Sequence, residues 1–147
     1  MIAPDVNLLI YAYDSASEFH RPARTYWANT LSSLNPVGIP IHCVYGFLRI
    51  ITHPALGPNR MPMPEALDIV DEWLQLPQVR LLLPGDRHWA MVKEIIASSR
   101  AVGPFVSDVA IAATVMEYGA VLHTNDRGFA RIDGLRWHNP LAPQRRP

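Results

Sequence analysis

Apolar residues in this chain form longer segments with helical spacing and short runs that are typical of buried strands. After the apolar pair at positions 2–3, Val6, Leu9 and Ile10 follow one helix face, and Asp5 stands where that helix would be capped. Segments with a helical pattern lie at 5–14, 18–34, 43–52, 63–76, 86–100 and 105–119. Runs expected to contain strands lie at 2–3, 35–42, 79–84, 120–124 and 135–139.

Prolines and glycines mark the ends of several predicted helices. Pro64 lies near the start of segment 63–76 and Pro77 ends it, while Pro54 stops segment 43–52 because the residue before a proline avoids the α region. Gly119 is expected to cap the helix that begins near residue 105. Short strands separated by helices predict an α/β fold with a mainly parallel sheet.

Length and composition are those of an ordinary globular domain. A chain of 147 residues favours one domain, which we place at 1–141, and the tail 142–147 is predicted to be disordered. Thirteen basic residues balance thirteen acidic ones, so net charge gives no drive toward nucleic acid. Cys43 is the single cysteine, which excludes an intrachain disulfide and a cysteine-based metal cluster. With neither a basic, apolar leader nor a long apolar run, we expect a cytoplasmic protein.

Three aspartates separated in sequence are expected to meet at one edge of the sheet. Asp5 follows the first strand, Asp126 follows the strand at 120–124, and Asp108 lies near the start of an apolar helix. Ligands of parallel sheets gather at the carboxyl ends of the strands. Three carboxylates there suit Mg²⁺ or Mn²⁺, which would activate a water molecule and neutralise charge on a phosphate.

Each aspartate also has an ordinary structural explanation. Asp5 and Asp108 are plausible helix N-caps, and Asp126 lies in the turn "NDRG", where its side chain would bond the backbone. Glu117 is nine residues after Asp108, which at about 100° per residue puts it on the opposite helix face. We therefore interpret Glu117 as a solvated residue at the end of its helix.

Three sequence blocks resemble a known family. The blocks are "PDVNLLIYA", "GFLRIITHP" and "VSDVAIAATVMEYGAVLHTNDRGFARIDGLRWHNPL", and together they run from the start of the chain to about residue 141. They are similar to the PIN-domain family, in particular to the VapC-like toxins of bacterial toxin–antitoxin pairs. The last block is the most specific, because its aspartate, Ala-rich helix, glycine, strand and "TNDRGF" turn occur in that order.

The resemblance implies a three-layer α/β/α sandwich and a Mg²⁺- or Mn²⁺-dependent endoribonuclease. Asp5, Asp108 and Asp126 match the metal-binding acids of the family. Asn7 matches a position that is usually polar, where it would orient Asp5 or a metal-bound water, or else it is a surface residue of the first helix. Thr124 precedes Asp126 closely enough to add a hydroxyl to the site, although turn chemistry explains it as well. The resemblance further implies an RNA substrate, a cognate antitoxin that blocks the groove, and a homodimer.

The chain departs from the family where many members carry a fourth acid, a glutamate in the middle helix. Gly46 or a neighbour stands at this place, and no acid occurs between Glu18 and Glu65. One metal ion held by three aspartates is therefore the expected site. Arg49, one turn further on, would contact a substrate phosphate or pair with a site carboxylate, or else it is a surface arginine.

Two other functions compete with the ribonuclease. One is a catalytically inactive member that binds RNA or protein, which the missing glutamate keeps open. The other is a haloacid-dehalogenase-like phosphatase, which also begins with an aspartate after its first strand. That class needs a second aspartate two residues later and a distant lysine, whereas this chain has Asn7 there and Lys93 as its only lysine.

Overall fold

Five short strands form a single sheet at the centre of the molecule. The structure is a computed structural model, and it describes residues 1–143; residues 144–147 of the predicted tail lie outside the described residues. The strands are β1 (Ile2–Pro4), β2 (Val37–Pro40), β3 (Val79–Leu82), β4 (Val121–His123) and β5 (Trp137–His138). They are all parallel and lie in the order β3-β2-β1-β4-β5.

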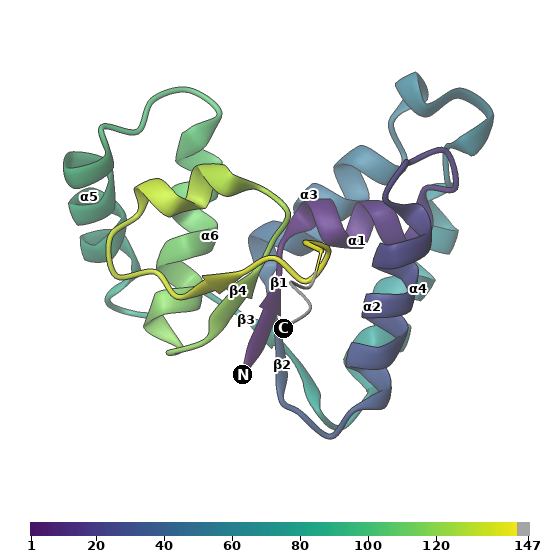
Figure 1. Cartoon of the computed structure of the whole chain (residues 1–147), viewed down its shortest axis with the longest axis horizontal. Coiled ribbons are helices and arrows are strands. Elements are labelled where there is room, and N and C mark those ends of the chain that lie inside the picture. Colours follow the sequence, from purple (N-terminus) through teal and green to yellow (C-terminus); the bar gives the residue numbers. More distant parts are fainter. Residues whose placement is uncertain (144–147) are drawn as a thin grey trace.

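Helices cover both faces of this sheet. They are α1 (Val6–Tyr13), α2 (His20–Ser32), α3 (Ile41–Ile51), α4 (Met63–Gln75), α5 (His88–Ser99) and α6 (Phe105–Glu117), with 3₁₀ segments η1 (Pro54–Asn59) and η2 (Arg127–Arg131). In Figure 1, α5 and α6 lie to the left of the strands and α1–α4 to the right. The predicted three-layer α/β/α sandwich is confirmed. Within the described residues, no helix is both long and apolar enough to cross a membrane.

The connections after β1 and β3 explain both the layers and the position of the candidate site. The chain moves from β1 to β2 and β3 in one direction, and then returns through α5 and α6 to β4 on the other side of β1. Right-handed crossovers therefore put the first four helices on one face and the last two on the other. Because β1 and β4 are neighbours, paired from Ile2↔Val121 to Pro4↔His123, a crevice is expected where they end.

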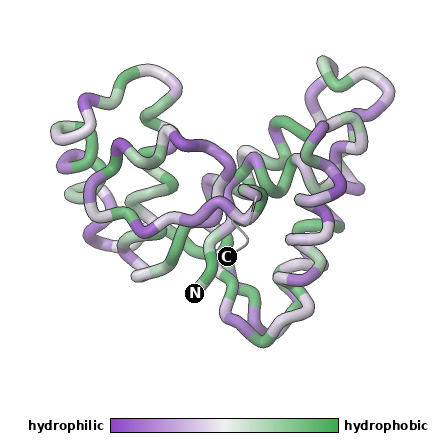
Figure 2. Tube along the Cα trace, viewed as in Figure 1, coloured by the Kyte–Doolittle hydropathy of each residue, from purple (hydrophilic) through white to green (hydrophobic). Residues whose placement is uncertain are grey.

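Aromatic side chains join the helices on the α1–α4 face. The Trp73 ring of α4 lies 5.0 Å from Phe47 of α3, 5.5 Å from Trp27 of α2 and 5.7 Å from Tyr13 of α1, measured between centroids. Trp73 Nε1 also donates a 2.9 Å hydrogen bond to the Tyr13 hydroxyl. This cluster fixes α1 against α3. Figure 2 shows the matching pattern, with mainly hydrophobic residues along the central strands and alternating character along outer helices such as α2.

Around α5 and α6 the structure differs from the sequence predictions in one helix boundary and in the interpretation of two acidic residues. The helix predicted from Asp86 begins at His88, because the Glu117 carboxylate accepts hydrogen bonds from the backbone N–H groups of Gly85 (2.9 Å) and Arg87 (3.1 Å). Glu117 is half-buried, so the interpretation of it as a solvated residue is wrong. In α6, Pro104 occupies the N-cap and Asp108 lies in the first turn, so the N-cap explanation of Asp108 is also wrong.

Helices α1 and α3 pack closely against each other at Gly46. A Cβ atom added at Gly46 would lie 2.7 Å from Cγ2 and 3.1 Å from Cγ1 of Val6. Real Cβ atoms essentially never approach another heavy atom so closely, so the Val6 side chain fills the space that any larger residue at position 46 would need. Position 46, one of the places considered for the fourth acid of the family, therefore has little room for a larger side chain.

Gly46→Ala should therefore destabilise the protein. We expect a loss of about 1–2 kcal/mol in unfolding free energy, because overpacking costs 1–3 kcal/mol while replacing a mid-helix glycine returns 0.5–1 kcal/mol. Urea unfolding monitored by circular dichroism measures the change. The double variant Val6→Ala/Gly46→Ala is the control, since it removes both clashing methyl groups and should recover much of the loss. Equal stability of Gly46→Ala and the parent would contradict the close packing.

Candidate functional site

Asp5 is buried at the end of β1, where its backbone N–H still pairs with β4. Its residue exposure is only 4%, and its backbone N–H donates to the His123 carbonyl at 2.9 Å. As the N-cap of α1, Oδ1 accepts from the Val6 N–H at 2.7 Å. Oδ2 accepts from Asn7 Nδ2 and from Thr124 Oγ1, each at 2.7 Å. Asp5 is thus both a helix cap, as one interpretation predicted, and the centre of a buried polar network.

Thr124 connects that network to the loop after β4. The Thr124 side chain is fully buried, and its hydroxyl donates to Asp5 while accepting from the Asp126 N–H (2.9 Å) and from Asn7 Nδ2 (3.1 Å). A hydroxyl has one proton and two lone pairs, so all its hydrogen-bonding capacity is used. The backbone of Asp126 is therefore held at a fixed position relative to the carboxylate of Asp5.

The loop that carries Asp126 is held from two further sides. Asp126 Oδ1 accepts from the Gly128 N–H at 2.7 Å and so caps η2, which matches the turn role considered from sequence. The Asn125 N–H donates to Asn7 Oδ1 (3.4 Å), and Asn139, after β5, donates through Nδ2 to Asn125 Oδ1 (2.9 Å). Sequence reasoning missed Asn139. Its position in the quoted "RWHNPL" segment was the only signal for it.

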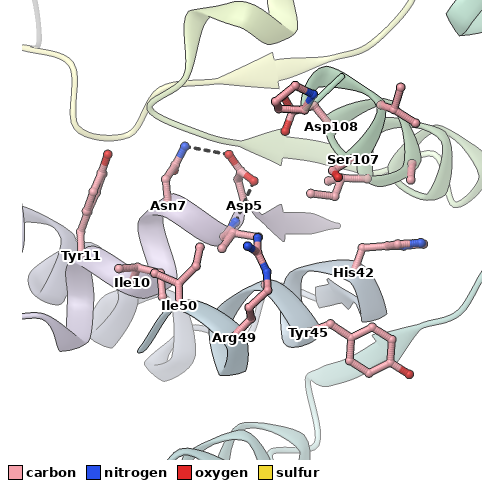
Figure 3. A pocket seen from close by; sticks show the side chains of 16 residues that line it. Asp5, Asn7, Ile10, Tyr11, His42, Tyr45, Arg49, Ile50, Ser107 and Asp108 are labelled. Carbon is pink, nitrogen blue, oxygen red and sulfur yellow. Dashed lines mark hydrogen bonds between the residues drawn. The ribbon is translucent and has the colours of Figure 1, made fainter. Parts of the chain in front are cut away.

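Asp108 faces Asp5 across a cavity of about 970 Å³. Residues from α1, α3 and the start of α6 form its walls, and Figure 3 shows Asp108 on the opposite side of the opening from α3. Asn7 and Arg49 line the same cavity. In Figure 3 the Arg49 side chain points from α3 toward Asp5. Gly46 also lines the cavity. The stretch of α3 where a fourth acid is missing from the sequence is therefore part of the cavity wall.

Burial and mutual repulsion shift the acidity of two of the three carboxyl groups. Burial is the main cause that raises the pKa of Asp5 to about 6; Asp108 and Asp126 raise it further, against the hydrogen bonds from Thr124 and Val6. Burial and the charge of Asp126 raise the pKa of half-buried Asp108 to about 6. The structure therefore brings the three aspartates into one electrostatic site. None of the groups that shift these two pKa values is a cation.

The donor set fits a hard divalent cation, but no closed ligand group is formed in advance. Among the residues described by the structure, no three His, Cys, Asp or Glu side chains are arranged so that they could hold a metal ion as they stand. Both oxygens of Asp5 accept hydrogen bonds, and one oxygen of Asp126 caps η2. Mg²⁺ is commonly bound through one or two carboxylates and retained waters, and a bound cation would favour the ionised form of these carboxyl groups.

Sequence reasoning also missed other residues of the cavity wall. His42 and Tyr45 of α3 and Ser107 of α6 line it together with the predicted residues. The signal was present in the spacing, because His42, Tyr45 and Arg49 follow one another at intervals of three and four residues. Such intervals place side chains on one helix face.

Comparisons with known proteins agree with this architecture. The sequence model of the PIN-domain family matches residues 2–135. The chain is 36% identical over 141 residues to ribonuclease VapC33 of Mycobacterium tuberculosis, an alignment that covers 96% of this chain and 99% of that protein. It is 32% identical over 144 residues to ribonuclease VapC43 of the same species, covering 98% of each.

Solved structures with the same architecture share little sequence with the chain. VapBC2 from Rickettsia felis, bound to a DNA fragment from its promoter, gives a TM-score of 0.69 at 16% identity and covers 95% of this chain and 98% of that chain. VapC20 of Mycobacterium tuberculosis, a sarcin–ricin loop cleaving toxin, gives 0.67 at 14% identity and covers 88% and 93%. At these identities the likeness establishes the fold alone.

Asp108→Asn should change how stability depends on pH. The folded protein raises the pKa of Asp108 from 3.8 to about 6, so the stability that this group contributes is fully present below about pH 3.8. That contribution is lost as the pH rises through about 6. We expect the variant to be more stable than the parent at about pH 7.5, on the order of 1 kcal/mol for a half-exposed group, and equally stable near pH 4.

Urea unfolding across this pH range measures the difference. Asp133→Asn is the matched control, because Asp133 is an exposed aspartate in the loop after η2 and its replacement should leave the profile unchanged. If the free energies of unfolding of Asp108→Asn and of the parent changed with pH in parallel, the ionised form of Asp108 would not be destabilised in the folded protein.

Proposed function

The chain belongs to the PIN-domain family, and on that premise we propose that it is a metal-dependent endoribonuclease, the toxin of a toxin–antitoxin pair that acts in the cytoplasm. The observation that carries the proposal is the cavity lined by Asp5 and Asp108, with Asp126 near enough for its charge to raise the pKa of both. Its relatives over nearly the whole chain are named ribonucleases. The phosphatase alternative is set aside by the family.

In this proposal Asp5, Asp108 and Asp126 hold one Mg²⁺ or Mn²⁺ ion. When bound, such an ion neutralises charge on the phosphate and makes a water molecule more acidic. A single ion is favoured because Val6 closes the space beside Gly46, where a further acid would stand. The carboxylates repel one another before the ion arrives, so part of its binding free energy comes from relieving that repulsion.

The neutral residues around Asp5 keep the carboxylates in place. Asn7 and Thr124 bind the same oxygen of Asp5, and Thr124 also holds the backbone of Asp126. Hydrogen bonds of this kind orient metal-binding carboxylates without cancelling their charge. Thr124 acts as a positioning residue, because its side chain is buried away from any substrate.

The reaction is hydrolysis of an RNA phosphodiester. A water oxygen bonds to phosphorus, the bond from phosphorus to the 3′ oxygen breaks, and a proton passes to that oxygen. The products carry a 5′-phosphate and a 3′-hydroxyl. The same carboxylates form an anionic site for the antitoxin, which would block the groove by placing an arginine among them. Homodimerisation stays a prediction from the family.

Purified, antitoxin-free protein should cut RNA with Mg²⁺ or Mn²⁺ and stop when EDTA is added. End analysis of the products should find 5′-phosphates; cyclic phosphates would instead indicate attack by the 2′-hydroxyl and contradict the mechanism. Asp108→Asn should lower the rate at least roughly a hundredfold, since even partners outside the metal's own ligands are typically worth 10- to 100-fold. Asp133→Asn should cut like the parent.

A folded protein that cuts no RNA under any of these conditions would refute the ribonuclease. It would leave the inactive binding module, which Mn²⁺ titration distinguishes, because an inactive site should bind Mn²⁺ poorly.

Thr124→Val should show whether the Thr124 hydroxyl positions the carboxylates of the site or only contributes to the stability of the fold. Valine has nearly the same shape but cannot donate to Asp5 or accept from Asp126, so we expect a loss of roughly 10- to 100-fold in activity and weaker Mn²⁺ binding. Stability should fall by about 1–3 kcal/mol, because buried partners are left unpaired. Thr124→Ser keeps the hydroxyl and should retain most of the activity and Mn²⁺ affinity. An unchanged Mn²⁺ affinity in Thr124→Val would overturn the positioning role.

A further inference from the structure

One face of α3 is turned to the cavity and is not explained by metal binding. Tyr45 and Arg49, four residues apart, both line it. Tyr45 is 62% exposed, although most of the aromatic rings of α1–α4 are used in the core. In Figure 3, Arg49 points toward Asp5, whereas Tyr45 extends away from the carboxylates to the right. The two side chains therefore continue the site of Asp5 and Asp108 along α3.

Arg49 supplies the positive charge that a phosphate needs at this site. Two carboxylates line the cavity and would repel an RNA backbone, and Arg49 is the one lysine or arginine among the described residues that line it. His42 does not add a cation, because burial and the neighbouring His88 lower its pKa. Its ring stacks on His88 at 5.7 Å, which makes it a packing residue. A guanidinium binds phosphate oxygens through paired hydrogen bonds.

We propose that the Tyr45–Arg49 face of α3 binds an unpaired RNA strand, with Arg49 on a backbone phosphate beside the carboxylates and Tyr45 stacked on a neighbouring base. This deepens the proposed function and rests on it. An exposed ring can stack only on a base whose face is free, and bases in a duplex already stack on each other. Aromatic platforms beside a cationic groove are the usual way to hold single strands without reading their sequence.

RNA binding without cleavage tests the proposal. The full-length Asp108→Asn protein in EDTA is titrated into a fluorescein-labelled, unstructured RNA, and anisotropy gives the affinity at several salt concentrations. Arg49→Ala should weaken binding and reduce the slope of log K against log salt by about 0.7, the value for one phosphate contact on a single strand. Arg49→Lys should keep the slope, because it keeps the charge.

Tyr45→Ala should act differently from Arg49→Ala. We expect roughly five- to hundredfold weaker binding, typical of the loss of one base–aromatic stack, with an unchanged salt slope. Tyr45→Phe retains the ring and should bind like the parent. With the same RNA annealed into a duplex, Tyr45→Ala and Tyr45→Phe should bind equally.

Two exposed residues outside this cavity provide matched controls. Arg21→Ala removes a cation from α2, and Trp89→Ala removes an aromatic ring that is 65% exposed on α5. Neither should change the affinity for unpaired RNA. Light scattering and binding of the co-expressed antitoxin are measured for every variant, since a second copy of the chain and the antitoxin are the other possible occupants of this face.

The outcomes separate this inference from the proposed function. If the parent cleaves RNA while Arg49→Ala and Tyr45→Ala bind it like the Asp108→Asn background, the inference is wrong and the ribonuclease stands. A Tyr45→Ala variant that changes only the oligomeric state or the antitoxin affinity also overturns it. If the parent neither cleaves nor binds RNA, both fail together.

Discussion

The buried carboxylate of Asp5 is the constraint on which the rest of the site depends. The group is held by neutral donors, namely a backbone N–H, the amide of Asn7 and the hydroxyl of Thr124. A buried charge normally acquires a partner of opposite sign, because hydrogen bonds alone replace only part of its hydration. Here burial, and to a lesser extent the charges of Asp108 and Asp126, raises the pKa of Asp5. The fold thus stores an unbalanced negative charge between β1 and β4.

The sheet topology made most of this site predictable from sequence. Asp5 and Asp126 each follow a short apolar run, and the carboxyl ends of parallel strands share one edge, so their convergence needs no knowledge of side-chain packing. Helix pattern and proline positions located the elements to within a few residues. The start of α5 was predicted at Asp86, whereas the helix begins at His88. Glu117, thirty residues downstream, accepts the backbone hydrogen bonds that delay the helix.

The features that sequence could not predict depend on contacts across the fold. Thr124 looks like an ordinary turn residue until the β1–β4 pairing places its hydroxyl against Asp5. Gly46 reads as a missing acid, whereas the structure shows that Val6 occupies the space beside it. Both depend on distances between elements that are far apart in the chain, and periodicity within one element carries no information about such distances.

In the proposed function, the unbalanced charge would let one site serve both catalysis and inhibition. Since the donors to Asp5 are neutral, the cavity attracts any cation that can enter it, whether a divalent ion or an arginine side chain of an antitoxin. The two would compete for the same carboxylates, so removing the antitoxin would be sufficient to let the ion bind. Arg49 lines the same cavity but is not among the groups that shift the pKa of Asp108, which burial and the charge of Asp126 raise to about 6. In the proposed function, a cation fixed to α3 assists a phosphate while the ion is held by the carboxylates on the other side of the cavity.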